Sequence, residues 1–328
     1  MILRWIVSFT LSIFIGITAW AGWHIYQFYQ PNQDGYKHSD YIKIEKNATL
    51  NQVCQSLYQK GIVQKPKLLS LWLRLLNMDK IQAGVYQYVG RDAVMWFMDD
   101  LNKGNVVQLP FVVIAGQTWS SIQAHMDSMP WLDNDITRNT IKRVSQSDNL
   151  DGLLLADTYY FTAGSKGSDL IHRANEHLEK VLDKYWQTRS SGLPYRSPYD
   201  MLIAASIIEK ETAIENERVV ISQVIVNRLI QHMRLQMDPT VIYALGSNYQ
   251  GSLSKEDLKV DSPYNTYRNY GLPPTPIAMV SKTSIEAAAH PQPGDYLYFV
   301  ATGDGHHYFS NNYEKHRQAV NRYIQRKV

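Results

Sequence analysis

The chain begins with an uninterrupted apolar stretch. Residues 5–23 carry no charged side chain, and aromatic residues gather near both ends of the stretch. A helix that rises about 1.5 Å per residue would make this stretch roughly 28 Å long, close to the ~30 Å hydrocarbon thickness of a bilayer. The pattern predicts a transmembrane anchor over residues 1–30. A cleaved signal peptide is the alternative, because Ala19-Trp20-Ala21 fits a small-x-small cleavage site, and a buried core helix is another.

A small module follows the apolar stretch. Residues 31–40 are polar and rich in turn formers, which predicts a linker. From there the pattern predicts a strand at 41–46, a helix capped by Thr49 that runs to Lys60, a helix that opens at Pro66, a strand at 83–88 and a helix at 92–103. The order strand, helix, helix, strand is typical of a LysM-like βααβ module over residues 41–108, although any small α+β unit would show the same pattern.

The remainder, residues 109–328, predicts a mixed α/β domain, so the whole chain belongs to the mixed α+β class. The expected elements are a strand at 106–114, a helix after Thr118, a short strand at 157–161, helices at 168–189 and 198–232, a hairpin of 296–301 with 307–309, and a closing helix at 310–327. The hairpin follows from Gly303-Asp304-Gly305 between two alternating segments. The first half of the 198–232 helix is apolar all round, which predicts that it is buried.

Composition narrows the function classes. Lys and Arg total 33 and Asp and Glu total 30, a net charge of +3 without a concentrated basic patch, so a nucleic-acid binder is not expected. The single cysteine, Cys54, allows no internal disulfide or thiolate-rich zinc site and is expected to be a buried hydrophobe. His306 and His307 are adjacent, so in a strand they would point to opposite faces. We therefore expect no metal and no cofactor.

The strongest candidate for chemistry is a carboxyl at the end of the apolar half of the 198–232 helix. Glu209 follows two isoleucines, and desolvation there favours the protonated form that a general acid needs. A solvated glutamate face is the alternative; on one continuous helix Glu211 and Glu215 would share a face, while Glu209 and Glu211 would not. Glycosidases usually need two carboxylates. The next acid, Asp238, precedes a proline and is more typical of a turn.

Five segments resemble, in the same order, the MltG/YceG-like family of endolytic murein (lytic) transglycosylases. They are 206–212 (SIIEKET), 234–243 (RLQMDPTVIY), 262–267 (SPYNTY) with 271–277 (GLPPTPI), 287–291 (AAAHP) and 296–300 (YLYFV). The resemblance covers about residues 40–325 together with the anchor. Two places depart from it: 114–116 is Ile-Ala-Gly where the family has Pro-Glu-Gly, and 152–159 is GLLLADTY where the family has Gly-aromatic-aromatic-Pro-Asp-Thr-Tyr.

The resemblance implies an enzyme that needs only one catalytic carboxyl. Glu209 would protonate the glycosidic oxygen between MurNAc and GlcNAc and would then take the proton of the MurNAc 6-hydroxyl. That hydroxyl attacks C1 and closes a 1,6-anhydro ring, so the substrate supplies the nucleophile. Gln236, Tyr264 and Asn265 would bind the N-acetyl group and the oxocarbenium-like sugar, and Glu211 would help to position the helix. For Asn265, beside a proline, an Asx-turn is the alternative.

The same resemblance implies a location and partners. The expected protein is a single-pass protein of the bacterial inner membrane with its catalytic part in the periplasm; the positive flank formed by Arg4 and the amino terminus predicts that the amino terminus lies in the cytoplasm. Its partner would be the glycan strands of nascent peptidoglycan, and membrane-bound peptidoglycan synthases are a family-level expectation. Two alternatives remain: a muramidase-type hydrolase of the same bond, and a catalytically inactive glycan-binding scaffold. A second buried carboxylate would favour the hydrolase.

Overall fold

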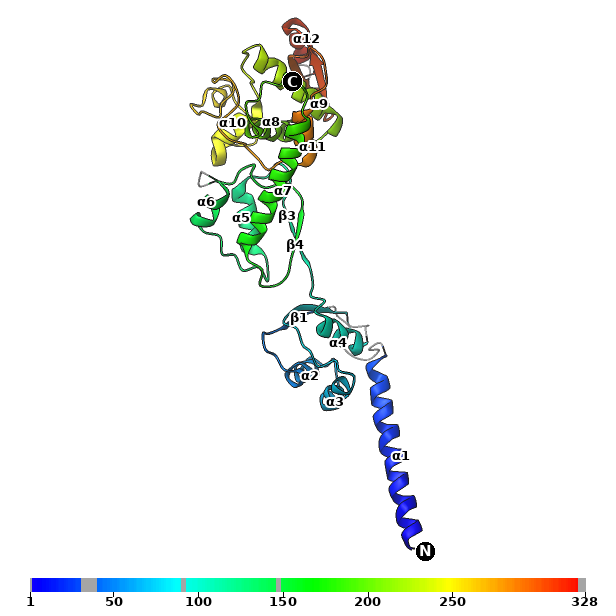
Figure 1. Cartoon of the computed structure of the whole chain (residues 1–328). Coiled ribbons are helices and arrows are strands. Elements are labelled where there is room, and N and C mark those ends of the chain that lie inside the picture. The colour runs from blue at the N-terminus through cyan, green and yellow to red at the C-terminus, as the bar shows by residue number, and fades with distance from the viewer. Residues whose placement is uncertain (1, 31–39, 90–92, 146–148, 324–328) are drawn as a thin grey trace. The chain divides into compact units, whose positions relative to one another are not determined.

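The computed structural model describes residues 2–30, 40–89, 93–145 and 149–323. Two compact units are present: the first comprises Met1–Leu109 with Tyr160–Ser165, and the second Pro110–Tyr159 with Lys166–Val328. Figure 1 shows their elements in chain order. The linker expected at 31–40 lies almost entirely outside the described residues, and a domain boundary between 108 and 109 stays a prediction.

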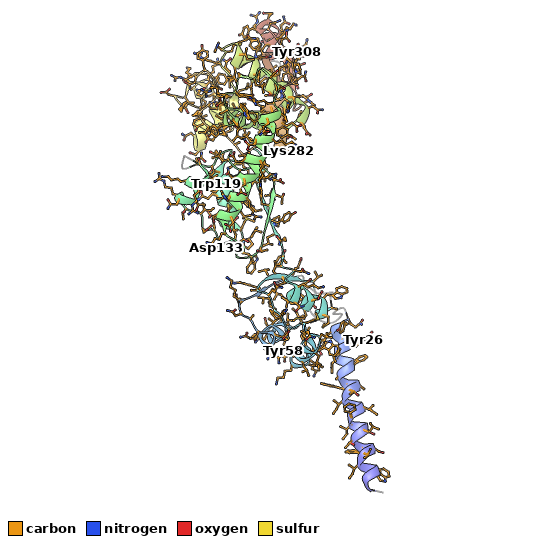
Figure 2. The ribbon with its side chains drawn as sticks, viewed as in Figure 1. Tyr26, Tyr58, Trp119, Asp133, Lys282 and Tyr308 are labelled. Carbon is orange, nitrogen blue, oxygen red and sulfur yellow. The ribbon has the colours of Figure 1, made fainter. Side chains whose placement is uncertain are left out.

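The chain opens with helix α1 (Ile2–Phe28). Its segment Trp5–Phe28 is long and apolar enough to cross a membrane, with a mean hydropathy of 1.6, and of its residues only Phe28 is buried. Aromatic residues occur near both ends of this segment, and Tyr26, labelled in Figure 2, lies near its carboxyl-terminal end. The helix is compatible with the expected membrane anchor.

The rest of the first unit has the expected order of elements. These are β1 (Asp40–Ile44), α2 (Leu50–Gln59), α3 (Pro66–Leu75), β2 (Gly84–Tyr88) and α4 (Val94–Lys103). The strands β1 and β2 pair antiparallel, with Ile42 opposite Tyr86. Thr49 caps α2 as predicted, because its hydroxyl accepts from the Gln52 amide at 3.3 Å while the Gln52 side chain accepts from the Thr49 amide at 2.8 Å. The likeness of this βααβ unit to LysM modules stays a prediction.

The core of the first unit is built from one face of each helix. Leu57, Leu69, Leu73, Met98 and Leu101 are fully buried there. Cys54 is 1% exposed in α2, which confirms the expected buried cysteine. Burial raises the pKa of its thiol to about 11, so the thiol is protonated and unreactive at neutral pH.

The second unit is mainly helical. Strands β3 (Leu109–Val112) and β4 (Thr158–Phe161) have residues in both units. The other elements of the second unit are α5 (Trp119–Ser128), α6 (Arg138–Val144), α7 (Gly167–Thr188), α8 (Pro198–Glu211), α9 (Glu215–Ile230), α10 (Asp238–Leu245), the short 3₁₀ helices η1 (Gly246–Asn248) and η2 (Asp257–Lys259), α11 (Lys282–Ala289), β5 (Tyr298–Ala301), β6 (His307–Ser310) and α12 (Tyr313–Tyr323). Strand β3 pairs with β4, and β5 with β6, so every described sheet has two strands. Helix α8 packs against α7, α9, α10 and α11 and forms the centre of the core.

The prediction of a single helix over 198–232 is wrong, because the helix ends at Thr212 and a second one begins at Glu215. Thr212 adopts an extended conformation with φ −143° and ends α8. Its hydroxyl then accepts a hydrogen bond from the Ile214 amide at 3.0 Å, which competes with a continued helical bond. Because α9 starts anew at Glu215, Glu211 and Glu215 do not share a helix face.

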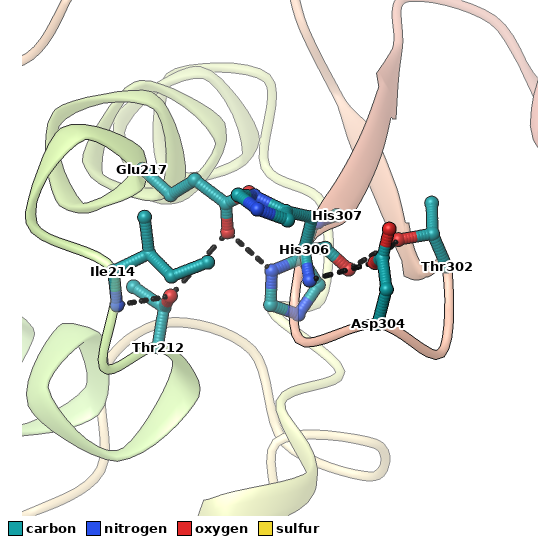
Figure 3. Close-up of polar contacts among 7 residues, drawn as sticks. All are labelled: Thr212, Ile214, Glu217, Thr302, Asp304, His306 and His307. Carbon is teal, nitrogen blue, oxygen red and sulfur yellow. Dashed lines mark hydrogen bonds and ion pairs between the residues drawn. The ribbon is translucent and has the colours of Figure 1, made fainter.

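The start of α9 is tied to the β5–β6 hairpin by one carboxylate, drawn in Figure 3. Glu217 accepts from the His307 amide at 3.0 Å and lies 2.7 Å from Nδ1 of His307 and 3.2 Å from Nδ1 of His306. Burial opposes ionisation of Glu217, but the hydrogen bonds from both histidines outweigh it and lower its pKa. The expectation that the two histidines point apart is therefore wrong: β6 begins at His307, and His306 still lies in the turn.

Candidate functional site

The site is built on the carboxyl end of α8. The Ser197 hydroxyl caps the helix by accepting from the Asp200 amide at 3.2 Å, and Pro198 occupies its first turn. Residues 200–208 are all buried, which fixes the axis and rotation of the helix in the core. Glu209 and Glu211 follow in the last turn. Residues two apart on a helix lie on nearly opposite sides, so the two carboxyls enter different surroundings.

Glu209 is enclosed and fully paired. Its side chain is 5% exposed and that of Arg218, its ion-pair partner on α9, is 12% exposed. Arg218 Nη2 donates to Oε1 of Glu209 at 3.0 Å. The amide and the hydroxyl of Ser281 donate to Oε2 at 2.9 and 2.5 Å. Arg218 also donates to the hydroxyls of Ser281 and Thr283. The cluster joins α8, α9 and the start of α11, and both carboxylate oxygens have donors within the protein.

Glu211 lies in the opposite kind of environment. No described residue donates a hydrogen bond to its carboxyl or forms an ion pair with it. Burial and the nearby Asp238 carboxylate raise its pKa to about 8, with Arg228 acting in the other direction. A carboxyl with that pKa carries its proton at neutral pH. This is the property that a general acid needs.

Asp238 is the first residue of α10, and its carboxyl lies close enough to Glu211 to act on it. The hydroxyl of Tyr267 donates to its Oδ1 at 2.5 Å. Burial and this hydrogen bond raise the pKa of Tyr267, which therefore stays a neutral donor. Asp238 itself is exposed, so it is accessible from solvent while Glu211 is only partly so.

Arg228 supplies a buried cation beside Glu211. It is 6% exposed on α9. Its donors are directed at backbone carbonyls: Nε at Leu297 at 2.6 Å, and Nη1 at Leu235 and Arg234 at 2.5 and 3.3 Å. Its guanidinium lies 5.3 Å from the centre of the Tyr298 ring. These contacts hold the cation in place without neutralising it by a carboxylate, so its field acts on Glu211.

Gln236 and Tyr264 lie on loops of the same unit. Gln236 is exposed and adopts a left-handed conformation with φ 51°, held by a bond from its amide to the Thr266 carbonyl at 3.1 Å. A non-glycine residue in this conformation is uncommon and is a feature of functional sites. Tyr264 packs against Tyr243, with ring centres 4.8 Å apart, and its hydroxyl lies 2.8 Å from that of Thr275.

Asn265 is engaged in holding its own loop. It is completely buried, its amide nitrogen donates to the carbonyls of Leu258 and Val260 at 3.0 and 2.8 Å, and its oxygen accepts from the Tyr267 amide at 2.9 Å. The bond from the Tyr267 amide is the Asx-turn that the sequence offers as an alternative, and the bonds to Leu258 and Val260 tie this turn to a second segment. Asn265 therefore helps to orient Tyr267, whose hydroxyl donates to Asp238.

The two segments that depart from the family pattern contact the last turn of α8 and the 271–277 loop. The Lys210 ammonium donates to the Gly116 carbonyl at 3.2 Å, so the turn at 114–116 contacts the last turn of α8. Gly152 has φ +73°, and a Cβ there would lie 2.2 Å from Cβ of Pro276. Only glycine permits this approach to the 271–277 loop.

Sequence reasoning missed three members of the cluster around Glu211. These members are Asp238, whose place before a proline is more typical of a turn, Tyr267 and Arg228. A signal for Arg228 exists: it is a cation two residues after the apolar run Val224-Ile225-Val226. The proximity of Asp238 to Glu211 has no sequence signal, because it depends on how α10 packs against α8.

Comparison with known proteins gives a consistent result. The chain matches the YceG-like family over residues 42–322. It is 30% identical over 310 residues to the endolytic murein transglycosylase of Bacillus subtilis (strain 168), covering 87% of this chain and 85% of that protein. The endolytic murein transglycosylase of Streptococcus pneumoniae serotype 2 is 25% identical over 366 residues, covering 98% of this chain and 66% of that protein.

A solved structure agrees with the sequence comparisons. The crystal structure of a YceG-like protein from Listeria monocytogenes is 28% identical and superposes with a TM-score of 0.53, covering 86% of this chain and 99% of that chain. The match to the family extends from β1 to within α12 and includes every residue of the cluster around Glu211. This chain therefore belongs to the YceG-like family.

Proposed function

We propose that the protein is an endolytic murein transglycosylase, a lyase that cleaves the β-1,4 bond between MurNAc and GlcNAc in peptidoglycan strands and leaves a 1,6-anhydroMurNAc end. The names of its relatives and the family match support the reaction class. The single observation that carries the site is the contrast between two carboxyls on α8: one is paired and enclosed, and the other carries a raised pKa beside unpaired charges.

The acid/base role fits Glu211 better than Glu209, the residue that the sequence favours. The proton must be available for the glycosidic oxygen, and at neutral pH a carboxyl with a pKa of about 8 carries one. Glu209 would first have to leave the Arg218 cation and the Ser281 donors that occupy both its oxygens. We therefore assign the acid/base role to Glu211, and to Glu209 the fixing of α8 against α9 and α11.

One carboxyl can serve both proton transfers. The protonated Glu211 gives its proton to the leaving glycosidic oxygen, and the resulting carboxylate takes the proton of the MurNAc 6-hydroxyl as that oxygen bonds to C1. Arg228 favours the ionised form and Asp238 the protonated form, so the carboxyl lies between two opposing fields. This balance suits a group that must lose and regain a proton within one cycle.

Neighbouring residues would bind the sugars. Asp238, fixed by Tyr267, is placed to stabilise positive charge that develops on the sugar ring. Gln236, exposed and held in a left-handed conformation, and Tyr264, packed against Tyr243, are the candidates for contact with the N-acetyl group. Asn265 acts on this set through Tyr267, as a positioning residue.

The apolar helix α1 supports a single-pass membrane protein. We propose that α1 spans the bacterial inner membrane with its amino terminus in the cytoplasm, and that the remainder works on the outer side on nascent glycan. Membrane-bound peptidoglycan synthases are the proposed protein partners, because their product is the strand that this site would cut.

A hydrolase of the same bond is the second candidate, and one observation favours it. Asp238 provides the second carboxyl near the acid that inverting and retaining glycosidases use. An exposed carboxylate already hydrogen-bonded by a tyrosine is less suited to activating water than a free one, so the lytic reaction is preferred.

Product mass separates the candidates. Purified peptidoglycan would be incubated with the full chain in detergent micelles and the fragments weighed by mass spectrometry. We expect fragments one water lighter than hydrolytic products, with their formation lost in Glu211→Gln. Fragments that carry the full water would establish a hydrolase and direct attention to Asp238. Binding without any cleavage would leave the protein as a glycan-binding scaffold.

A further inference from the structure

Helix α3 exposes a face on which apolar and basic side chains alternate. Lys67, Leu71, Arg74 and Leu75 follow one another at the spacing that places residues on one side of a helix. Leu71 is 56% exposed and Leu75 68% exposed, and both basic residues are exposed as well. Exposed leucines flanked by long basic side chains on a helix are typical of helices that lie in a membrane interface.

The charge around this face is of one sign. Residues 46–78, which include α2 and α3, contain the basic residues Lys46, Lys60, Lys65, Lys67 and Arg74 and no aspartate or glutamate. The chain as a whole is almost balanced at +3. Residues 46–78 therefore carry five positive charges and no negative one, and such a segment is attracted to an anionic surface.

A depression between α2 and α3 gives this surface a specific polar feature. It has a volume of about 380 Å³ and is lined by Asn51, Gln55, Pro66, Lys67, Ser70, Leu71 and Arg74. The Asn51 side-chain oxygen accepts from the Ser70 hydroxyl at 2.5 Å and from Arg74 at 3.4 Å. This contact fixes the guanidinium at the rim and uses one of its five donors. The remaining donors, with the Lys67 ammonium, suit the oxygens of a phosphate group.

Contacts with α1 fix the depth of α3 relative to the apolar span. Trp72 donates to the hydroxyl of Tyr29 at 3.1 Å, and Phe28 is buried in the core of the module. The Lys65 ammonium lies 5.9 Å from the centre of the Trp20 ring. Trp20 precedes the end of the span at Phe28 by eight residues, roughly 12 Å along a helix. The start of α3 therefore lies beside the last turns of the apolar span.

We infer that the exposed face of α3, with the depression beside it, docks on the anionic headgroups of the membrane that α1 spans. Lys67 and Arg74 contact lipid phosphates there, and Leu71 and Leu75 enter the layer below them. This inference rests on the membrane anchoring in the proposed function and goes beyond it. The module would then be held at the bilayer by two contacts, α1 and the exposed face of α3, instead of by α1 alone.

The test places a fluorescent label on this face of the full chain in lipid nanodiscs. Because Cys54 is buried with a protonated thiol, a Leu71→Cys variant can be labelled selectively with a polarity-sensitive dye. Nanodiscs of phosphatidylcholine alone would be compared with nanodiscs that also contain phosphatidylglycerol, both with nitroxide-bearing lipid as quencher. We expect a blue shift and at least twofold stronger quenching in the anionic discs.

Charge variants identify the contact. Lys67→Gln with Arg74→Gln should remove the difference between the two lipids. Lys43→Gln with Lys103→Gln is the matched control, because it removes the same charge from exposed positions of the same unit outside α3 and should keep that difference. Equal quenching in both lipids, or equal loss in both double variants, would overturn the inference.

Two outcomes separate this inference from the proposals it rests on. If the chain enters the discs but the dye stays fully hydrated, α1 is an anchor and α3 is not a docking face. If the chain does not enter the discs, the proposed anchoring is wrong and the inference falls with it. Peptidoglycan fragments that shield the dye in place of lipid would also overturn it, since the face would then be a glycan site.

Discussion

The two carboxyls in the last turn of α8 lie two residues apart and have opposite surroundings. Glu209 has a donor for each of its oxygens, with the Arg218 cation among them. Glu211 has a neighbouring carboxylate, a cation that is bonded elsewhere, and no donor among the described residues. The difference teaches that burial alone does not identify a catalytic acid. A buried carboxyl with its partners satisfied stabilises the fold, whereas one left without partners keeps a proton that chemistry can use.

The largest effect is expected from removing the unpaired carboxyl. Glu211→Gln should lower the rate of anhydro-product formation by about 10²–10⁴-fold, the usual contribution of a general acid or base. Folding should not suffer, because glutamine is neutral as the protonated carboxyl is. Rates measured on purified glycan strands would check this, with Glu215→Gln as the exposed control. If folded Glu209→Gln lost more activity than Glu211→Gln, the acid/base role would return to Glu209.

The paired carboxyl should instead show its effect in stability. Glu209→Gln leaves Arg218 buried beside an uncharged partner, and breaking a buried ion pair in this way costs about 3–5 kcal/mol of unfolding free energy. Urea denaturation would measure the loss. A double variant with Arg218→Met should recover most of it, since the uncompensated charge is then gone. A single variant as stable as the wild type would show that the pair contributes little to the fold.

Glu217 is a third carboxyl for this comparison, because it is paired with His306 and His307 and does not belong to the last turn of α8. Glu217→Gln should destabilise the unit by about 2 kcal/mol, as expected for lost hydrogen bonds to a charged group. The lowered pKa adds a pH signature: the stabilisation is present above pH 4.5 and is lost as pH falls through the lower folded value. Thermal melts of both proteins from pH 7 to pH 3 should converge at the acid end.

The comparison also predicts a pH dependence for Glu211. Activity should fall about tenfold per pH unit above pH 8, as the acid loses its proton. The sign for stability is opposite to that of Glu217. The folded carboxyl holds its proton above the unfolded value of 4.5, so stability is lost as pH rises from there towards 8. The Tm of Glu211→Gln should therefore exceed that of the wild type above pH 8 and match it near pH 4. A constant gap would mean that Glu211 does not titrate in this range.

Local sequence rules were most successful where local chemistry decides. The Thr49 cap of α2, the proline that opens α3 and the hairpin around Gly303-Asp304-Gly305 all follow from a few neighbouring residues, and all are confirmed. The rules failed at Thr212, where apolar periodicity continues on both sides of the break. The hydroxyl of Thr212 bonds to the Ile214 amide and ends the helix, and a period-based prediction does not detect such a competing bond.

The sequence by itself determined the family, the apolar span and the helix end on which the candidate acid lies, because these depend on residue types at fixed spacing. Only the tertiary structure shows the different surroundings of the two carboxyls, on which the proposed role of Glu211 rests. Arg218 and Ser281 reach Glu209 from α9 and from the start of α11, while Asp238 and Arg228 approach Glu211 from α10 and α9. Whether a carboxyl keeps its proton depends on charges and donors within a few ångströms, and residues far apart in the chain supply them.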